Sequence, residues 1–191
     1  MIPEEAVELV LARLDEYRIP YMITGSFASN MQGVPRATQD ADVIIEANQK
    51  SLGQFIESLG TDFYASPEAA KEALQIEGIF NIVHLETGFK VDLIIRKSRP
   101  FSQIEFSRRQ KVNFLGQSRW FATAEDIILA KLEWAKTGNS ERQITDALNV
   151  AKIRGNDLNW PYLQRWAEDL GVKDLLERLH NEVGHPHDPR G

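Results

Sequence analysis

The sequence contains no cysteine among its 191 residues. Disulfide bonds, thiolate zinc sites and cysteine nucleophiles are therefore excluded. The sequence also lacks the run of about 18 apolar residues that a membrane-spanning helix requires. Its first residues do not show the basic, apolar and small-residue order of a secretory signal. From these absences we expect a cytoplasmic protein without a membrane partner.

Positive charge is scarce: 22 Lys and Arg residues stand against 28 Asp and Glu residues, for a formal net charge of −6. Nonspecific nucleic-acid binding depends on neutralising many phosphates, so this balance disfavours it for the chain as a whole. A local basic patch is still compatible with the count. The run Arg108-Arg109-Gln110-Lys111 could contact a nucleic-acid acceptor or could form an ordinary solvated loop.

Composition and length indicate a globular protein, because 42% of the residues are hydrophobic and 26% are charged. A chain of 191 residues suits one domain, with or without a helical appendage. Apolar and β-branched runs predict strands at 21–24, 40–45, 79–85, 89–95, 112–115 and 118–121. Helical spacing and capping residues predict helices at 4–17, 27–31, 48–59, 66–75, 124–135, 142–153, 161–170 and 173–183.

This order of elements predicts an α/β (α+β) fold, with a small mixed sheet in front and a helical part behind. We place the first part at residues 1–122 and the helical part, packed on it, at residues 123–183. The remaining residues, 184–191, are predicted to form a mobile tail.

Two aspartates stand at the start of a predicted strand. Asp40 and Asp42 are two residues apart, so on a strand their side chains leave the same face and can share hard cations. The apolar residues that follow place both acids at the mouth of a buried strand, where unpaired carboxylates are costly. Without further support, such a pair is as well explained by a turn or a cap.

Asp92 repeats the pattern, because it lies inside the apolar run 89–95. A carboxylate there must be exposed, paired or bound to a metal ion. Lys90 and Arg96 are the nearby candidates for an ion pair. A third metal ligand is the alternative that fits Asp40 and Asp42.

Gly25-Ser26 follows the first predicted strand and supplies a complementary feature. A glycine lets the backbone pass close to a phosphate, and a serine at a helix start offers hydroxyl and backbone donors to it. Metal-binding acids and phosphate donors therefore occur in one sequence.

This combination resembles the signature of nucleotidyltransferases with the polymerase-beta fold. Gly25-Ser26 is followed after thirteen residues by Asp40-Ala41-Asp42-Val43, with Asp92 on a later strand. The sequence is most similar to the branch containing the AbiEii-type abortive-infection toxins, in which an Arg-x-Thr precedes the acids, here Arg36-Ala37-Thr38. The segment 123–132, with Lys131, and the later Arg142 and Asp146 also resemble that branch.

The resemblance implies that residues 1–122 form the nucleotidyltransferase core. It implies two Mg²⁺ ions held by Asp40 and Asp42, with Asp92 completing one metal site and helping to deprotonate the acceptor hydroxyl. Nucleoside triphosphate would be bound by Gly25, Ser26, Arg36, Thr38 and Lys131. Because Arg142 and Asp146 are four residues apart on a helix, a plain ion pair is an equal alternative for them.

The function expected from the resemblance is Mg²⁺-dependent transfer of a nucleoside monophosphate onto a hydroxyl or an RNA (tRNA-like) end. Such an enzyme could be the toxin of a pair with an antitoxin protein. A small-molecule acceptor such as an aminoglycoside-like antibiotic is the alternative within the enzyme class, because an acidic cleft attracts a cation. The alternatives outside it are a noncatalytic binding or regulatory module of this fold and an interaction protein of unrelated fold.

Overall fold

The computed structural model describes residues 2–32, 38, 40–138 and 140–184. The chain divides into two compact units: residues 1–27 with 37–122, and residues 28–36 with 123–191. The predicted nucleotidyltransferase core of residues 1–122 remains a prediction. The packing of 123–183 on the core and the mobility of 184–191 remain predictions, and residues 185–191 lie outside the described part.

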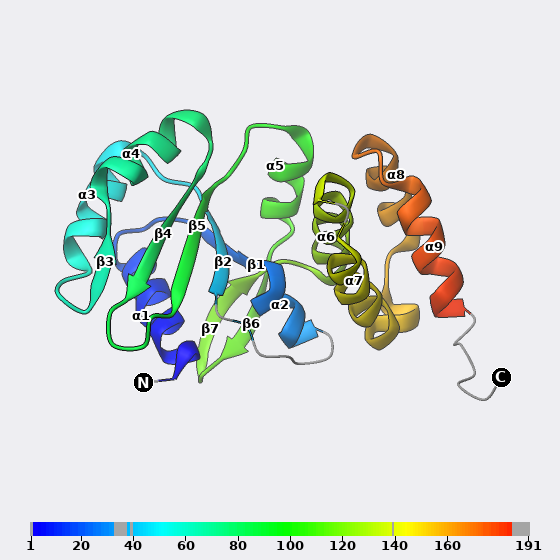
Figure 1. Ribbon diagram of the computed structural model, residues 1–191, viewed down its shortest axis with the longest axis horizontal. Coiled ribbons are helices and arrows are strands. Elements are labelled where there is room, and N and C mark those ends of the chain that lie inside the picture. The colour runs from blue at the N-terminus through cyan, green and yellow to red at the C-terminus, as the bar shows by residue number, and fades with distance from the viewer. Residues whose placement is uncertain (1, 33–37, 39, 139, 185–191) are drawn as a thin grey trace. The chain divides into compact units, whose positions relative to one another are not determined.

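The first unit contains a seven-stranded mixed sheet, with strands in the order β3-β4-β5-β2-β1-β7-β6 (Figure 1). Two neighbouring pairs, β2 with β5 and β1 with β7, are parallel, and the other pairs are antiparallel. The predicted mixed sheet is confirmed. The strands are β1 (Tyr21–Thr24), β2 (Asp40–Ile45), β3 (Phe63–Ala65), β4 (Ile79–His84), β5 (Lys90–Ile95), β6 (Gln110–Phe114) and β7 (Gln117–Phe121).

The central strands bury alternate residues on one face of the sheet. In β2 and β5, Ala41, Val43 and Leu93 are fully buried, whereas Asp42 and Asp92 between them are half-buried. Each fully buried valine or leucine contributes roughly 1.5–3 kcal/mol to folding. This alternation fixes the register, because a slip of one residue would turn the acids into the core.

Arg119 shows which face α1 (Pro3–Glu16) covers. It is buried in β7 and donates hydrogen bonds to Glu8 and Asp15 of α1. Arg119 and Phe121 are two apart in β7 and share a face, and Phe121 pairs in register with Ile23 of β1. The side chains of Ile23, Phe121 and Arg119 therefore point toward α1.

Three further helices complete the first unit: α3 (Gln49–Ser58), α4 (Pro67–Ile76) and α5 (Pro100–Ser107). Figure 1 shows α3 and α4 side by side near β3 and β4. Asn48 caps α3 by accepting from the backbone of Ser51 at 2.9 Å, and Ser66 caps α4 by accepting from Ala69 at 3.1 Å. Such caps satisfy donors that the first helical turn leaves unpaired.

The second unit is helical in its described residues. α2 (Gly25–Gln32) begins in the first unit and continues into this one. The others are α6 (Ala124–Gly138), α7 (Glu141–Arg154), the short 3₁₀ helix η1 (Gly155–Asp157), α8 (Trp160–Asp169) and α9 (Lys173–Gly184). The start of α6 is fixed by Thr123, whose hydroxyl donates to buried Asp126 at 2.6 Å, and Tyr162 donates to the same carboxylate at 2.5 Å. None of the helices in the described part of the chain combines the length and apolar character that crossing a bilayer requires.

The sequence did not predict β3 or α5. β3 has only three residues, too few to show an alternating pattern. In α5 the buried face combines Phe101 and Phe106 with Ser102 and Glu105, so polarity does not mark the inward side. Hydrophobic periodicity cannot reveal a helix whose buried face is half polar.

Candidate active site

A row of polar residues crosses four strands on one face of the sheet. Asp42 of β2 is the register partner of Asp92 in β5 and of Thr24 in β1. Asp92 is in turn the partner of Asn81 in β4. Register partners share a face, with side chains starting about 5 Å apart. The sheet therefore brings Asp42 and Asp92 together from positions 50 residues apart in the sequence.

The polar row lies on the sheet face opposite to α1. Asp42 is adjacent in β2 to Val43, which is the register partner of Ile23. Because neighbouring residues of a strand point to opposite faces, Asp42 points away from the side that Ile23 and α1 share. The acids are thus half-buried on the face opposite to α1, and the buried apolar residues Met22 and Ile44 lie farther along the same face.

Asp40 lies on the same face as Asp42, one step toward the start of β2. Its register partner is Lys90 of β5. The hydroxyl of Thr38 donates to the carboxylate of Asp40 and to its backbone carbonyl, both at 3.0 Å. Thr38 therefore orients the first acid, whereas the sequence assigned it to the nucleotide.

The electrostatics of Asp92 depend on its burial and on the charges of Lys90 and Asp40. Burial raises the pKa of the Asp92 carboxyl above its ordinary value, the charge of Lys90 lowers that pKa, and the negative charge of Asp40 raises it. The ionised form of Asp92 is therefore disfavoured by lost solvation and by a second carboxylate. A cation placed among these acids would relieve both effects.

Gly25 approaches Asp42 closely at the end of β1. It adopts φ of +63°, and a Cβ atom built on it would lie 2.7 Å from Cγ and 2.9 Å from Cβ of Asp42. Ser26 follows as the second residue of α2. The first turn of a helix carries unpaired N–H groups that favour anions. Gly25 and Ser26 belong to the same compact unit as the three acids.

The donor chemistry at this face fits Mg²⁺. Magnesium prefers oxygen ligands, and carboxylates are its usual protein ligands. Asp42 and Asp92 are direct register partners, and Asp40 lies one step away on the same face. As their side chains stand, no three Asp, Glu, His or Cys residues in the described part of the chain are grouped closely enough to hold a metal ion. The strand pairing thus places the three aspartates next to one another, but their carboxylates would have to turn toward each other to share an ion.

Lys131 is held in a buried ion pair in the second unit. Its ammonium donates to Asp146 at 3.0 Å and to Gln143 at 3.1 Å, and only 3% of the residue is exposed. The sequence left open a pairing of Asp146 with Arg142, but the ion pair that the structure describes for Asp146 is with Lys131. Arg36, also predicted to contact the nucleotide, lies outside the described residues.

Two residues of the polar row were missed by the sequence analysis. Asn81 is exposed in the middle of the strand 79–84, beside Asp92, and Thr24 is buried beside Asp42. An asparagine inside an apolar strand was a usable signal, because asparagine is depleted in strands. Only the register shows that it adjoins an acid.

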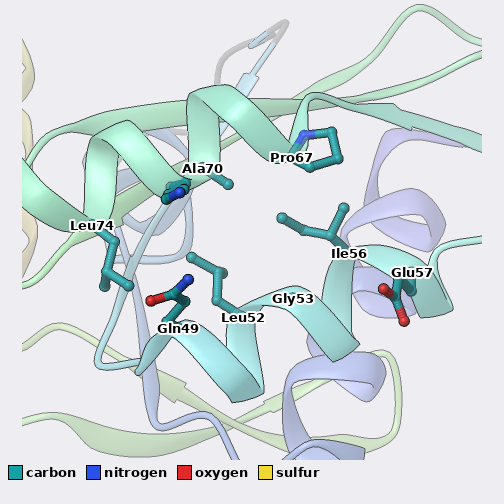
Figure 2. Close-up of a pocket in the computed structure, with 9 residues that line it drawn as sticks. Gln49, Leu52, Gly53, Ile56, Glu57, Pro67, Ala70 and Leu74 are labelled. Carbon is teal, nitrogen blue, oxygen red and sulfur yellow. The ribbon is translucent and has the colours of Figure 1, made fainter.

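A cleft elsewhere in the first unit is a different feature. It is a cleft of about 210 Å³ between α3 and α4, where Leu52, Ile56, Pro67 and Leu74 face one another (Figure 2). Glu57 is its only carboxylate. Lys71 also lines the cleft, but none of Asp40, Asp42 and Asp92 does, so it is not the candidate active site.

Comparison with known proteins yields matches among solved structures only: no protein-family model and no curated protein sequence matches the chain. An antigenic nucleotidyltransferase-like protein from Paracoccidioides brasiliensis aligns with a TM-score of 0.58 and 18% identity, over 78% of this chain and 74% of that one. The antibiotic-resistance factor ANT(2'')-Ia aligns with a TM-score of 0.56 and 14% identity, over 96% of both chains. The lincosamide antibiotic adenylyltransferase LnuA aligns with a TM-score of 0.52 and 13% identity, over 78% of this chain and 96% of that one.

These matches show that the chain has a nucleotidyltransferase-like fold, as the sequence predicted. At 13–18% identity these matches show the fold alone. The reaction has to be argued from the residues of the site. None of the three is an AbiEii-type toxin, so that more specific resemblance remains a prediction.

Proposed function

We propose that this protein is a nucleotidyltransferase that moves a nucleoside monophosphate from a nucleoside triphosphate onto an acceptor hydroxyl. The observation that supports the proposal most directly is the register pairing of Asp42 with Asp92, at the point where Gly25 meets Asp42. An unrelated sheet protein has no reason to gather carboxylates next to a glycine-led helix start. The nucleotidyltransferase-like fold supports the same conclusion.

In the proposed reaction, the acceptor oxygen forms a bond to the α-phosphorus while the bond from that phosphorus to the bridging oxygen breaks. Pyrophosphate leaves, and the hydroxyl proton passes to a carboxylate oxygen of Asp92. Asp40, Asp42 and Asp92 would hold Mg²⁺, which supplies charge stabilisation on both sides of an in-line displacement when bound. Gly25 and Ser26 would hold the terminal phosphates through backbone and hydroxyl donors.

The other proposed nucleotide contacts differ in what supports them. Thr38 acts through Asp40, whose carboxylate it orients. Arg36 is kept as a phosphate ligand on the resemblance alone. For Lys131, a triphosphate must compete with Asp146 for the buried ammonium, so its phosphate role is the most demanding part of the proposal.

The proposed acceptor is a hydroxyl of an RNA end, and the toxin and antitoxin relationship is a proposal that follows from the AbiEii resemblance. A small antibiotic is the second candidate. ANT(2'')-Ia was solved with adenylyl-2''-tobramycin and aligns with a TM-score of 0.54 over 94% of this chain, and LnuA was solved with lincomycin. The net charge of −6 suits a cationic acceptor. A noncatalytic module is the third candidate, and it would have no chemical reason to retain three acids.

The test is transfer of label from each of four α-labelled nucleoside triphosphates, with Mg²⁺, onto total RNA, tobramycin, lincomycin and the protein itself. Asp42→Ala should abolish the label, and Asp62→Ala should not, because Asp62 is an exposed aspartate of the same unit outside the polar row. Label that appears on an acceptor with the wild type and Asp62→Ala, but not with Asp42→Ala, supports the proposed activity and identifies the acceptor class. Absence of label and of triphosphate binding by a folded wild type would contradict the proposal.

A further inference from the structure

Positive charge is concentrated in one segment of the acidic chain. Residues 96–111 contain six basic residues and a single acid, Glu105, so the segment carries +5 and the remainder of the chain carries −6 − 5 = −11. The segment lies entirely in the first compact unit. Its basic residues are Arg96, Lys97, Arg99, Arg108, Arg109 and Lys111.

Arg109 is held against two aromatic rings. Its guanidinium carbon lies 4.2 Å from the ring centre of Phe106 and 5.0 Å from that of Trp120. Its Nη1 donates to the carbonyl of Phe106 at 2.6 Å, and its Nε is buried without a hydrogen-bond partner in the described part of the chain. Burial lowers the pKa of Arg109, and Glu46 raises it. The guanidinium is therefore fixed in place and incompletely satisfied.

Lys111 is the second cation at the same ring. Its ammonium lies 5.1 Å from the ring centre of Trp120, its register partner across β6 and β7. Lys111 is exposed, and among the described residues neither it nor Arg109 has a carboxylate within ion-pair distance. Arg96 differs, because it pairs with Glu46 at 2.9 Å while resting on Phe106. The charges of Arg109 and Lys111 thus remain available to an anionic ligand.

The sheet register places Trp120 and Lys111 on the face that carries the acids. Trp120 alternates with Phe121, which points to the side of Ile23 and α1, so Trp120 points to the opposite side, as Asp42 does. Lys111 follows Trp120 as its register partner. β7 and β6 are two and three strands from β2. At the usual strand spacing, this is about 10 Å and 14 Å across the sheet.

We infer that Arg109 and Lys111, positioned by Trp120 and Phe106, bind the phosphodiester backbone of a single-stranded RNA whose end is the acceptor. The inference rests on the proposed function for the transfer step and adds the residues that bind the proposed RNA acceptor. Cations spaced along a strand neutralise successive phosphates, and a polyanion reaching from them toward Asp42 presents its terminal hydroxyl to the site. A polycationic acceptor would be repelled by the same segment.

The binding test uses fluorescence anisotropy of a 5′-fluorescein single-stranded RNA in EDTA, without nucleotide, over a series of KCl concentrations. The test variant is Arg109→Gln/Lys111→Gln, and the matched control is Lys50→Gln/Lys71→Gln, two exposed lysines of the same unit. Each phosphate contact to a single strand contributes about −0.7 to the slope of log affinity against log salt, so the test variant should lose roughly 1.4 from that slope. Its affinity should fall about tenfold at low salt, and the control should match the wild type.

Three results would overturn the inference. The wild type could fail to bind RNA with salt dependence, the test variant could bind like the control variant, or polyglutamate could compete as well as unlabelled RNA. Circular dichroism of both variants checks that they are folded. Transfer assays with Asp42→Ala as the inactive control separate the two proposals. If the wild type binds RNA but shows no more transfer than Asp42→Ala, the RNA-binding surface stands and the proposed function is contradicted. If the wild type transfers label to a small molecule and does not bind RNA, the proposed function stands and the RNA-binding surface is contradicted.

Discussion

Gly25 and Asp42 approach each other so closely that no side chain fits at Gly25. A Cβ built there falls 2.7 Å from Cγ of Asp42, and the backbone already adopts φ of +63°. The close approach of the end of β1 to the start of β2 therefore requires a glycine at position 25. This contact holds the carboxylate of Asp42 against the start of α2.

Gly25→Ala should reduce transfer by on the order of 100-fold, because a shift of about 1 Å in a catalytic group costs that much. Gly88→Ala is the matched control, since Gly88 has φ of +68° and open space around its built Cβ. Gly88→Ala should lose about 1 kcal/mol of stability from left-handed backbone strain, and Gly25→Ala should lose more, because its Cβ also overlaps Asp42. Steady-state kinetics with urea unfolding separates the two effects. Equal activity in both variants would contradict the positioning role of Gly25.

Asp92→Asn should stabilise the metal-free protein while abolishing transfer. The pKa of Asp92 is raised in the folded state, so ionisation destabilises the fold as the pH rises through that pKa. An uncharged asparagine removes the lost solvation of the carboxylate and its repulsion by Asp40. We expect a gain in Tm of about 1–2 °C at pH 7, which corresponds to roughly 0.5 kcal/mol. Calorimetry in EDTA checks this, and a lower Tm than that of Asp62→Asn would contradict it.

Lys131→Met should destabilise the protein by about 3 kcal/mol, because it leaves the buried carboxylate of Asp146 without its cation. Lys131→Met/Asp146→Leu should recover most of that loss, since well-packed apolar residues replace buried ion pairs with little cost. Urea unfolding measures both variants. A double variant as unstable as the single one would show that the pair does more than neutralise charge.

The same double variant tests the proposed phosphate role of Lys131. If the lysine contacts the triphosphate, the folded double variant should bind nucleoside triphosphate at least tenfold more weakly than the wild type. Arg178→Met/Glu141→Leu is the matched control, because it removes an exposed ion pair of the second unit, with N–O distance 3.3 Å. Unchanged nucleotide affinity would assign Lys131 to structure alone.

Tyr21 should ionise near pH 12, because burial and the charge of Asp15 raise the pKa of its phenol to about 12 against the effects of Arg119. The unfolded phenol ionises near pH 10. The folded protein therefore holds its proton more tightly, and its stability should fall as the pH rises from 10 to 12. Absorbance titration near 295 nm, compared with Tyr21→Phe, detects this phenol. Loss of absorbance change at pH 10 in the Phe variant would contradict the prediction.

Local signals determined most of the elements. β2 and β5 were predictable because each combines consecutive apolar residues with a length typical of strands. α1 was predictable from five buried residues at helical spacing, and α4 from its cap Ser66 followed by Pro67. α5 was not, because Ser102 and Glu105 lie on its buried face. Elements whose inward side is apolar are readable from sequence, and elements with a mixed inward side are not.

The sequence by itself determined the residue types and the spacing of the candidate site: Asp40 with Asp42, Asp92 on a later strand, and Gly25 before a helix. Only the tertiary structure decided which side chains adjoin. Strand pairing places Asp92 next to Asp42 and Asn81, and Lys131 forms a buried ion pair with Asp146. Sheet alternation also places Trp120 and Lys111 on the face of the acids. The physical reason is that spacing along a strand fixes a face locally, whereas neighbours across strands are fixed by register, which depends on the burial of the whole sheet.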